Sequence, residues 1–136
     1  MSGDRSFLDT NLFIYLYSDT DLIKRKKVRE TIDQYERYVS TQVLNEFCSV
    51  SINKLKMPIE TVQAAVAEIM DVCNLSIVNY KTVAAALEYH EKYRYSYYDS
   101  LIIASAVESG CQYLLSEDMA DGQQIENKLT IRNIFK

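Results

Sequence analysis

Short apolar runs alternate with longer segments along this chain. The short runs predict five buried strands: Phe7-Leu8, Tyr38-Val39-Ser40, Leu75 to Val78, Tyr113-Leu114-Leu115 and Thr130-Ile131-Arg132. The longer segments predict helices over Leu12 to Tyr17, Asp21 to Glu36, Thr41 to about Asn53, Pro58 to Cys73, Thr82 to about Glu91, and Tyr97 to Ser109. Strands that alternate with helices indicate parallel βαβ units. The pattern therefore predicts an α/β fold, a three-layer α/β/α sandwich around a short-stranded parallel sheet.

The expected helix ends follow from residues that cap or interrupt helices. Asp9-Thr10-Asn11 can cap the first helix, and Thr82 is expected to cap the alanine-rich fifth helix. Pro58 suits the first position of its helix, where its missing N–H is not needed. Gly110 is the natural residue to follow the last helix, because glycine adopts the left-handed backbone there at little cost.

Composition indicates one folded domain over residues 1–136. Hydrophobic residues make up 48% of the 136 residues and charged residues 25%, a mix typical of globular proteins. The three cysteines are an odd number without short ligand spacing, which argues against a zinc site or a disulfide framework and favours a reducing compartment. Asp4 stands where a signal peptide has positive charge, and no apolar run approaches a membrane span. We expect a soluble, cytoplasmic protein without membrane association.

The charge balance is acidic, yet the basic residues are concentrated. Fifteen Lys and Arg against 19 Asp and Glu give a net charge of −4, which taken alone argues weakly against a polyanionic partner. The run Lys24 to Arg29 could contact RNA phosphates, although a solvated helix face is the commoner reading.

Aromatic residues and the single histidine are further candidates. Tyr93, Tyr95, Tyr97 and Tyr98 could stack on unpaired bases, and core packing is at least as good a reading for Tyr98. His90 is expected to be a packed or edge residue. A mechanism that needs two histidines has no second histidine to use.

Acidic residues follow successive predicted strands. They are Asp9 after the first strand, Glu46 in the helix after the second, Asp99 in the first turn of the helix Tyr97 to Ser109 after the third strand's crossover, and Glu117, Asp118 and Asp121 after the fourth strand. The ligand crevice of a parallel sheet lies beyond the carboxyl ends of its strands. Without a cation such a cluster of acids is unfavourable, because two like charges about 4 Å apart repel by roughly 4 kcal/mol at an effective dielectric near 20. Carboxylates gathered there are suited to Mg²⁺ or Mn²⁺ and to metal-dependent phosphate chemistry.

Each acid also has a purely structural reading. Asp9 could only cap a helix, Asp99 could only be a favourable charge at a helix N-terminus, and Asp118 and Asp121 could be turn formers. Glu46 lies on or beside an apolar stripe, where an unpaired glutamate is unusual. Each structural interpretation is plausible for one acid alone. It is much less plausible that acids after four successive strands all have structural roles only.

Four segments in order carry a family resemblance. The segments Phe7-Leu8-Asp9-Thr10-Asn11, Thr41 to Glu46, Tyr98 to Ala104 and Leu114 to Asp118 resemble the successive motifs of the PIN domain, most of all those of VapC-type toxins of bacterial toxin–antitoxin pairs. The resemblance spans Phe7 to about Gln123.

The resemblance implies a metal-dependent endoribonuclease that uses Mg²⁺ or Mn²⁺. Its catalytic and metal-binding acids would be Asp9, Glu46, Asp99 and Asp118. Asn11 and Ser116 would orient them, and Asp121 would be an auxiliary ligand. It further implies transfer RNA or another structured RNA as substrate, a cognate antitoxin that blocks the acidic groove, often with a basic side chain, and a homodimer. The helices from Leu12 to Glu36 are the expected partner-facing surface.

Two other functions stay open. An aspartyl phosphotransfer enzyme or phosphatase is one, although a dehalogenase-like phosphatase needs a second Asp where this chain has Asn11. A response-regulator receiver would need a pair of acids near its first strand and a later lysine, and neither is evident. A non-catalytic module that binds RNA or protein is the other alternative.

Overall fold

A six-stranded sheet forms the centre of the computed structural model, which describes residues 3–136; Met1 and Ser2 of the predicted domain 1–136 lie outside the described residues. The strand order is β3-β2-β1-β4-β6-β5, and every pair except β5–β6 is parallel. The strands are β1 (Arg5–Leu8), β2 (Glu36–Ser40), β3 (Asn74–Ser76), β4 (Tyr113–Leu115), β5 (Gln124–Ile125) and β6 (Leu129–Arg132).

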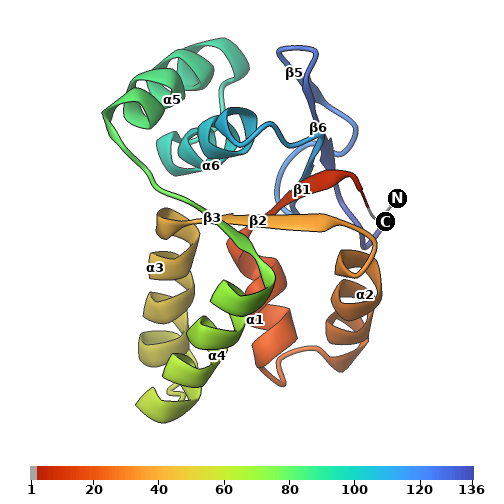
Figure 1. The fold of residues 1–136 in the computed structure, drawn as a ribbon, viewed down its shortest axis with the longest axis vertical. Coiled ribbons are helices and arrows are strands. Elements are labelled where there is room, and N and C mark those ends of the chain that lie inside the picture. The colour runs from red at the N-terminus through yellow and green to blue at the C-terminus, as the bar shows by residue number, and fades with distance from the viewer. Residues whose placement is uncertain (1–2) are drawn as a thin grey trace.

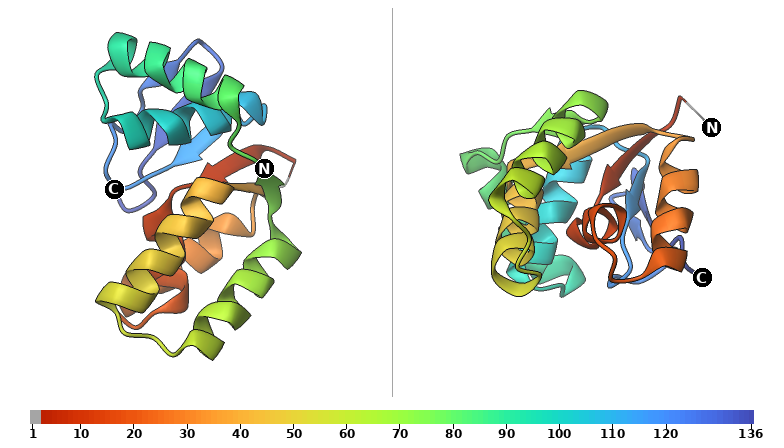
Figure 2. Two further views of the ribbon diagram at one scale, coloured as in Figure 1. Left: turned by 90° about the vertical axis from the view of Figure 1, so that its left-hand side faces the viewer. Right: turned by 90° about the horizontal axis from the view of Figure 1, so that it is seen from below.

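Helices cover both faces of this sheet, as predicted (Figure 1). Helices α5 and α6 lie on one face, and α1 to α4 lie on the other (Figure 2). The helices are α1 (Thr10–Tyr17), α2 (Leu22–Ile32), α3 (Thr41–Ser49), α4 (Ile59–Val72), α5 (Tyr80–Tyr93) and α6 (Tyr97–Glu108), with a π-helical turn η1 (Val50–Lys54) after α3. The predicted α/β/α sandwich is confirmed.

The central strand β1 is buried and fixes the position of its neighbours. Phe7 lies opposite Tyr38 of β2 on one side and Leu114 of β4 on the other, and Phe7 and Leu114 are fully buried. A strand covered on both faces is apolar throughout, which is why these runs could be recognised in the sequence. The carboxyl ends of β1, β2 and β4 consequently meet at one edge of the sheet.

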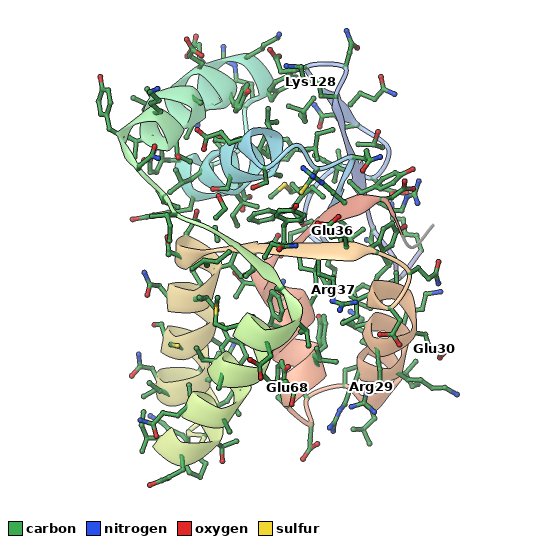
Figure 3. The ribbon with its side chains drawn as sticks, viewed as in Figure 1. Arg29, Glu30, Glu36, Arg37, Glu68 and Lys128 are labelled. Carbon is green, nitrogen blue, oxygen red and sulfur yellow. The ribbon has the colours of Figure 1, made fainter. Side chains whose placement is uncertain are left out.

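Arg37 ties the opposite edge together. Its guanidinium group donates hydrogen bonds to the carbonyl oxygen of Ile32 at the end of α2 (2.9 Å) and to that of Val72 at the end of α4 (3.1 Å). Figure 3 shows Arg37 beside Arg29 and Glu68 on this side of the molecule. These bonds satisfy helix-terminal carbonyls that have no partner within their own helices.

Several element boundaries differ from the predictions. Helix α2 ends at Ile32, because Glu36 already belongs to β2, and α3 ends at Ser49 with the π-helical turn behind it. Strand β3 covers Asn74–Ser76 instead of Leu75 to Val78. Strand β5, which was not predicted, has two residues, pairs antiparallel with β6 and is too short to show a sequence pattern.

Two predicted caps are also wrong. Pro58 precedes the first turn of α4 as its N-cap residue instead of opening the helix. Asn79, not Thr82, caps α5, and Thr82 is the third helical residue of a reciprocal capping box, in which its hydroxyl accepts the Asn79 N–H. The prediction for Gly110 is correct, since its φ is +70° and it follows Ser109, the C-cap residue of α6. Among residues 3–136, no helix is both long enough and apolar enough to cross a membrane.

We predict that Asn79→Ala lowers the free energy of unfolding by about 1 kcal/mol, because it removes the side-chain acceptor of the Thr82 N–H. Chemical denaturation monitored by circular dichroism measures this change. Asn79→Asp keeps the acceptor and should unfold close to wild type. Equal losses in both variants would contradict a capping role for Asn79.

Candidate active site

Four acidic side chains from four separate segments line one cavity of about 320 Å³. Asp9 directly follows β1, Glu46 lies on α3, Asp99 lies in the first turn of α6, and Asp118 follows β4. Thr10, Asn11, Ser49, Val50 and Ile102 complete the lining. The structure therefore brings together the four acids that the sequence singled out, at the carboxyl edge of the sheet.

Asp9 is the most deeply buried of these acids. Its Oδ1 accepts the backbone N–H of Thr10 at 2.7 Å, which caps α1, and its Oδ2 accepts the Ser116 hydroxyl at 2.8 Å. Burial raises the pKa of the Asp9 carboxyl to about 6, the two hydrogen bonds oppose the rise, and the charges of Asp99 and Glu46 add to it. Asp9 therefore both caps a helix and belongs to the acidic cluster.

Glu46 and Asp99 face the same cavity under different constraints. The Thr10 hydroxyl donates to Oε1 of Glu46 at 2.8 Å, so Thr10 links this carboxylate to the Asp9 turn. Burial raises the pKa of Asp99, a hydrogen bond from Ser96 lowers it, and the charge of Asp118 raises it again. Neighbouring negative charges thus add to burial in disfavouring the ionised forms of Asp9 and Asp99.

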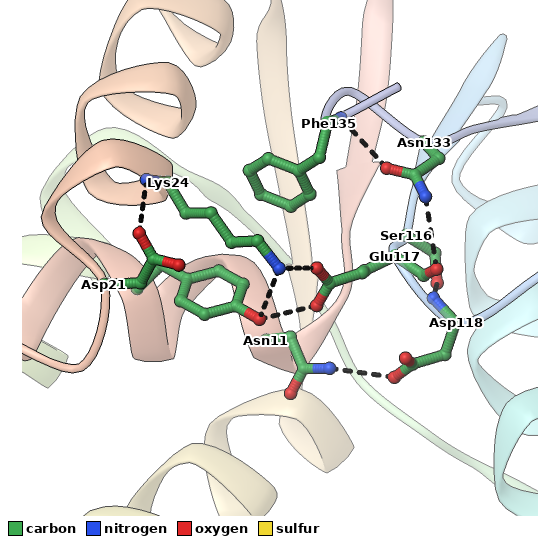
Figure 4. Close-up of polar contacts among 9 residues, drawn as sticks. Asn11, Asp21, Lys24, Ser116, Glu117, Asp118, Asn133 and Phe135 are labelled. Atoms are coloured by element: carbon green, nitrogen blue, oxygen red, sulfur yellow. Dashed lines mark hydrogen bonds and ion pairs between the residues drawn. The ribbon is translucent and has the colours of Figure 1, made fainter.

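Asn11 and Ser116 both form hydrogen bonds with Asp118 (Figure 4). The Asn11 amide donates to Oδ2 of Asp118 at 2.8 Å, and the Ser116 hydroxyl oxygen accepts the Asp118 N–H at 3.3 Å. Ser116 donates to Asp9 at the same time, so it connects two of the acids. Both residues therefore contact acids of the cavity.

Glu117, next to Asp118 in the chain, is bound on the other side of the loop. It forms an ion pair with Lys24, and the Tyr15 hydroxyl donates to its Oε1 at 2.5 Å. The Asn133 amide donates to the Glu117 carbonyl oxygen at 3.3 Å (Figure 4). These contacts attach the loop after β4 to α1, α2 and the C-terminal segment. With Glu117 held there, Asp118 is the acid of this loop that lines the cavity.

Asp121 does not line the cavity. Its Oδ1 accepts the backbone N–H of Asn133 at 2.8 Å, so it fastens the same loop to the segment after β6. This position gives no support to the predicted role as an auxiliary ligand.

Sequence reasoning missed Thr10, Lys24 and Asn133. The sequence predicts a solvated helix face or an RNA contact for the basic run that contains Lys24, but Lys24 forms an ion pair with Glu117. For Thr10 the one available signal was its place in the first motif, where its hydroxyl could donate a hydrogen bond to a neighbouring acid. The contact of Asn133 spans 16 residues, and no local pattern indicates it.

Two aromatic predictions have clear outcomes. Tyr98 is 64% exposed, so the reading of this residue as core is wrong. His90 is exposed on α5, with its Nδ1 2.6 Å from the Tyr95 carbonyl oxygen, and lies outside the cavity.

The donor set fits a hard divalent cation. The cavity offers carboxylate, hydroxyl and amide oxygens, and neither histidine nor cysteine is part of its lining. Within residues 3–136, no three Asp, Glu, His or Cys side chains converge closely enough to enclose a metal ion by themselves. Mg²⁺ does not require such a cage, because it commonly keeps several waters and binds through one or two carboxylates.

These features define an α/β/α protein with an acidic cavity at the carboxyl edge of its sheet. The PIN domain family model matches residues 6–120, so the chain belongs to the PIN domain family. A comparison of the sequence with curated proteins finds no significant match.

Solved structures of toxin–antitoxin proteins share the fold. VapC20 of Mycobacterium tuberculosis, described as a sarcin-ricin loop cleaving toxin, is 19% identical with a TM-score of 0.67, over 83% of this chain and 91% of that chain. A toxin–antitoxin complex from Klebsiella pneumoniae is 15% identical with a TM-score of 0.71, over 95% and 97%. DNA-bound VapBC from Salmonella typhimurium is 16% identical with a TM-score of 0.67, over 97% and 99%.

We predict that the metal-free protein loses stability as the pH rises from 4 to 7, in part through Asp9. The folded-state pKa of about 6 lies above the ordinary value of 3.8. The contribution of this group is therefore fully present below pH 4 and is lost as the pH passes 6. At most about 3 kcal/mol is involved, because one pKa unit corresponds to about 1.4 kcal/mol.

Asp9→Asn should flatten this part of the profile and stabilise the metal-free protein at pH 7. Urea denaturation of both proteins in a chelator, at several pH values between 4 and 7, measures the difference. Parallel profiles for the two proteins would contradict the raised pKa.

Proposed function

We propose that this protein is a metal-dependent endoribonuclease and the toxin of a type II toxin–antitoxin pair. One observation carries the proposal: four carboxylates from separate segments line a single cavity. Burial raises the pKa of two of them, Asp9 and Asp99, and the charges of neighbouring acids add to the rise. A bound cation would offset the repulsion between these negative charges and could take part in catalysis. Membership of the PIN domain family and the fold shared with VapC toxins support the same assignment. We further propose that residues 1–136 form one nuclease domain.

Mg²⁺ or Mn²⁺ would be held by Asp9, Asp99 and Asp118, in part through bound water because these side chains do not converge closely enough to enclose an ion by themselves, with Glu46 as a further ligand or as a base. When bound, such a cation polarises a phosphoryl oxygen and lowers the pKa of a water molecule. The roles of the side chains follow from their hydrogen bonds. Asn11 and Ser116 fix the orientation of Asp118 and Asp9, so that their remaining lone pairs are available for a ligand.

Glu46 is the candidate to accept a proton from the attacking water. The Thr10 hydroxyl occupies Oε1, which orients the carboxylate and makes Oε2 the acceptor. In this proposed hydrolysis water, and not the ribose 2′-hydroxyl, attacks phosphorus, and the bond from phosphorus to the 3′-oxygen breaks. The scissile phosphate then stays on the downstream fragment, and the upstream fragment leaves with a 3′-hydroxyl. Cleavage should therefore produce 5′-phosphate and 3′-hydroxyl ends.

The proposed partners are a structured RNA such as transfer RNA, a cognate antitoxin and a second copy of the chain. The toxin–antitoxin complexes among the similar structures support the antitoxin. The helices between Leu12 and Glu36 remain the proposed partner-facing surface, and two exposed apolar side chains, Leu22 and Ile23, support a protein contact there.

The other candidate functions have less support. In an aspartyl phosphotransfer enzyme of the dehalogenase type, a second carboxylate would stand at position 11, where the Asn11 amide instead donates to Asp118. A binding module without catalysis would have no need for mutually repelling carboxylates in one cavity. RNA cleavage that requires Mg²⁺ and Asp9 distinguishes the nuclease from such a module.

We predict that Asp99→Asn lowers Mg²⁺-dependent RNA cleavage by about 100-fold or more. Losing an outer-shell partner of a metal ligand already costs 10- to 100-fold, and here the charge of a ligand itself is removed. The metal-free variant should be at least as stable as wild type, because burial and Asp118 disfavour the Asp99 charge. Cleavage rates and thermal melting in a chelator test both parts. Asp71→Asn, which alters an exposed acid on α4, is the matched control and should leave both unchanged.

The chemical ends of the products test the mechanism separately. Ligation and phosphatase treatment of the fragments should identify a 5′-phosphate and a 3′-hydroxyl. Recovery of a 2′,3′-cyclic phosphate would show that the ribose hydroxyl attacks and would exclude water as the nucleophile. A large loss of melting temperature in metal-free Asp99→Asn would instead identify Asp99 as a structural cap.

A further inference from the structure

A second cavity of about 550 Å³ adjoins the acidic cavity. Glu46 and Ser49 line both cavities, so the two share a border along α3. Away from that border the second cavity is lined by Gln42, Asn45 and Tyr98, with Thr41 and Val78. Its size is within the range of ordinary ligand sites.

Tyr98 presents an aromatic face on a fixed backbone. Its side chain is 64% exposed, although it directly precedes Asp99 of the acidic cavity. The buried Gln42 side chain donates from Nε2 to the Tyr98 carbonyl oxygen at 3.1 Å, which ties the start of α6 to α3. The Tyr98 ring packs edge-on against Tyr97, with centroids 5.4 Å apart, and Tyr97 packs against the core between α5 and α6. The ring is thus held in place while much of it faces solvent.

The two cavities differ in charge. The acidic cavity has four carboxylates, whereas the second cavity has only Glu46, at its border. Amide, hydroxyl, aliphatic and aromatic groups make up the rest of its lining. Such a surface suits a flat, uncharged group that can stack on a ring and form hydrogen bonds at its edge.

We propose that this second cavity binds an unpaired nucleobase of the RNA next to the scissile phosphodiester, stacked on Tyr98. Asn45, which is exposed at the cavity, would meet the hydrogen-bonding edge of the base. The base must be unpaired, because a base stacked within a duplex cannot place its face on a protein ring. This inference rests on the proposed nuclease function and adds a selection for RNA loops or single strands.

Binding and kinetics with a fluorescein-labelled, 12-nucleotide single-stranded RNA test the proposal. Fluorescence anisotropy in the Asp99→Asn background gives Kd, and cleavage in the otherwise wild-type protein gives kcat and KM. Tyr98→Ala should raise Kd and KM about 5- to 150-fold, the range for loss of one stacked base, with a smaller effect on kcat. Tyr98→Phe keeps the ring and should bind within about twofold of wild type. Tyr80→Ala removes another exposed tyrosine, outside both cavities, and should have no effect.

An RNA series that lacks one base at a time identifies the stacked nucleotide. In the protein with Tyr98, one abasic position beside the cleavage site should weaken binding, and the same position should have no further effect with Tyr98→Ala. Asn45→Asp is a second variant that alters an exposed side chain and adds negative charge; it should raise KM without changing thermal stability.

Three outcomes would overturn the proposal. In the first, Tyr98→Ala binds and cleaves like wild type. In the second, the abasic effects simply add to that of Tyr98→Ala. In the third, Tyr98→Ala changes the elution volume of the protein without changing RNA binding, so that Tyr98 is a contact between proteins. In each of these cases wild-type cleavage that depends on Mg²⁺ and Asp99 would leave the nuclease function intact. A wild-type protein that neither binds nor cleaves RNA would reject the nuclease function itself.

Discussion

The buried carboxylate of Asp9 is the interaction on which the site and the centre of the fold both depend. Its oxygens accept hydrogen bonds from the first residue of α1 and from Ser116 after β4, while its own N–H donates to the Leu115 carbonyl oxygen at 3.1 Å. One residue thereby fixes where β1 ends, where α1 begins and how the loop after β4 lies. The same burial raises its pKa to about 6, because a charge in this place lacks the solvation it has in water. The group that organises the site is thus also a source of instability at neutral pH.

The loop after β4 separates two neighbouring acids that have different roles. Lys24 and Tyr15 bind the Glu117 carboxylate on one side, while Asp118 faces the cavity on the other. Asp121 and Asn133 attach the far part of the loop through the segment behind β6. Partial neutralisation of Glu117 by Lys24 keeps a fifth negative charge from adding fully to the four in the cavity. Partial burial favours a higher pKa for Glu117, but the hydrogen bonds from Lys24 and Tyr15 outweigh it and lower the pKa. The pKa of Asp9, in contrast, is raised.

What the sequence could predict depended on how local the signal was. The acids at the strand ends were recognisable because a buried parallel strand is an apolar run, and the residue that follows it must reach the carboxyl edge of the sheet. The pairing of Lys24 with Glu117 spans 93 positions, and a basic run on an amphipathic helix looks the same whether or not one member has a partner. Asn79 and Thr82 are both good capping residues and lie within one helical turn of each other. The sequence pattern therefore does not decide which of them is the N-cap residue of α5. Tyr98 lies at the start of an apolar helix, so the pattern favours burial, although its position in the first turn of α6 leaves the residue 64% exposed.

The electrostatics of the acidic cavity also connect two of the proposed ligands, the divalent cation and the antitoxin. Asp9 and Asp99 are unfavourable in their ionised forms mainly because they are desolvated and in addition because other acids stand nearby. A divalent cation would relieve the repulsion between these acids, and so would a basic side chain of an antitoxin that enters the groove. Under the proposed function, the cofactor and the inhibitor would therefore draw on the same interaction free energy, and binding of one would weaken binding of the other. Of these four carboxylates only Glu46 also lines the neighbouring cavity around Tyr98, so a base bound there would depend mainly on stacking and shape and would be less sensitive to that competition.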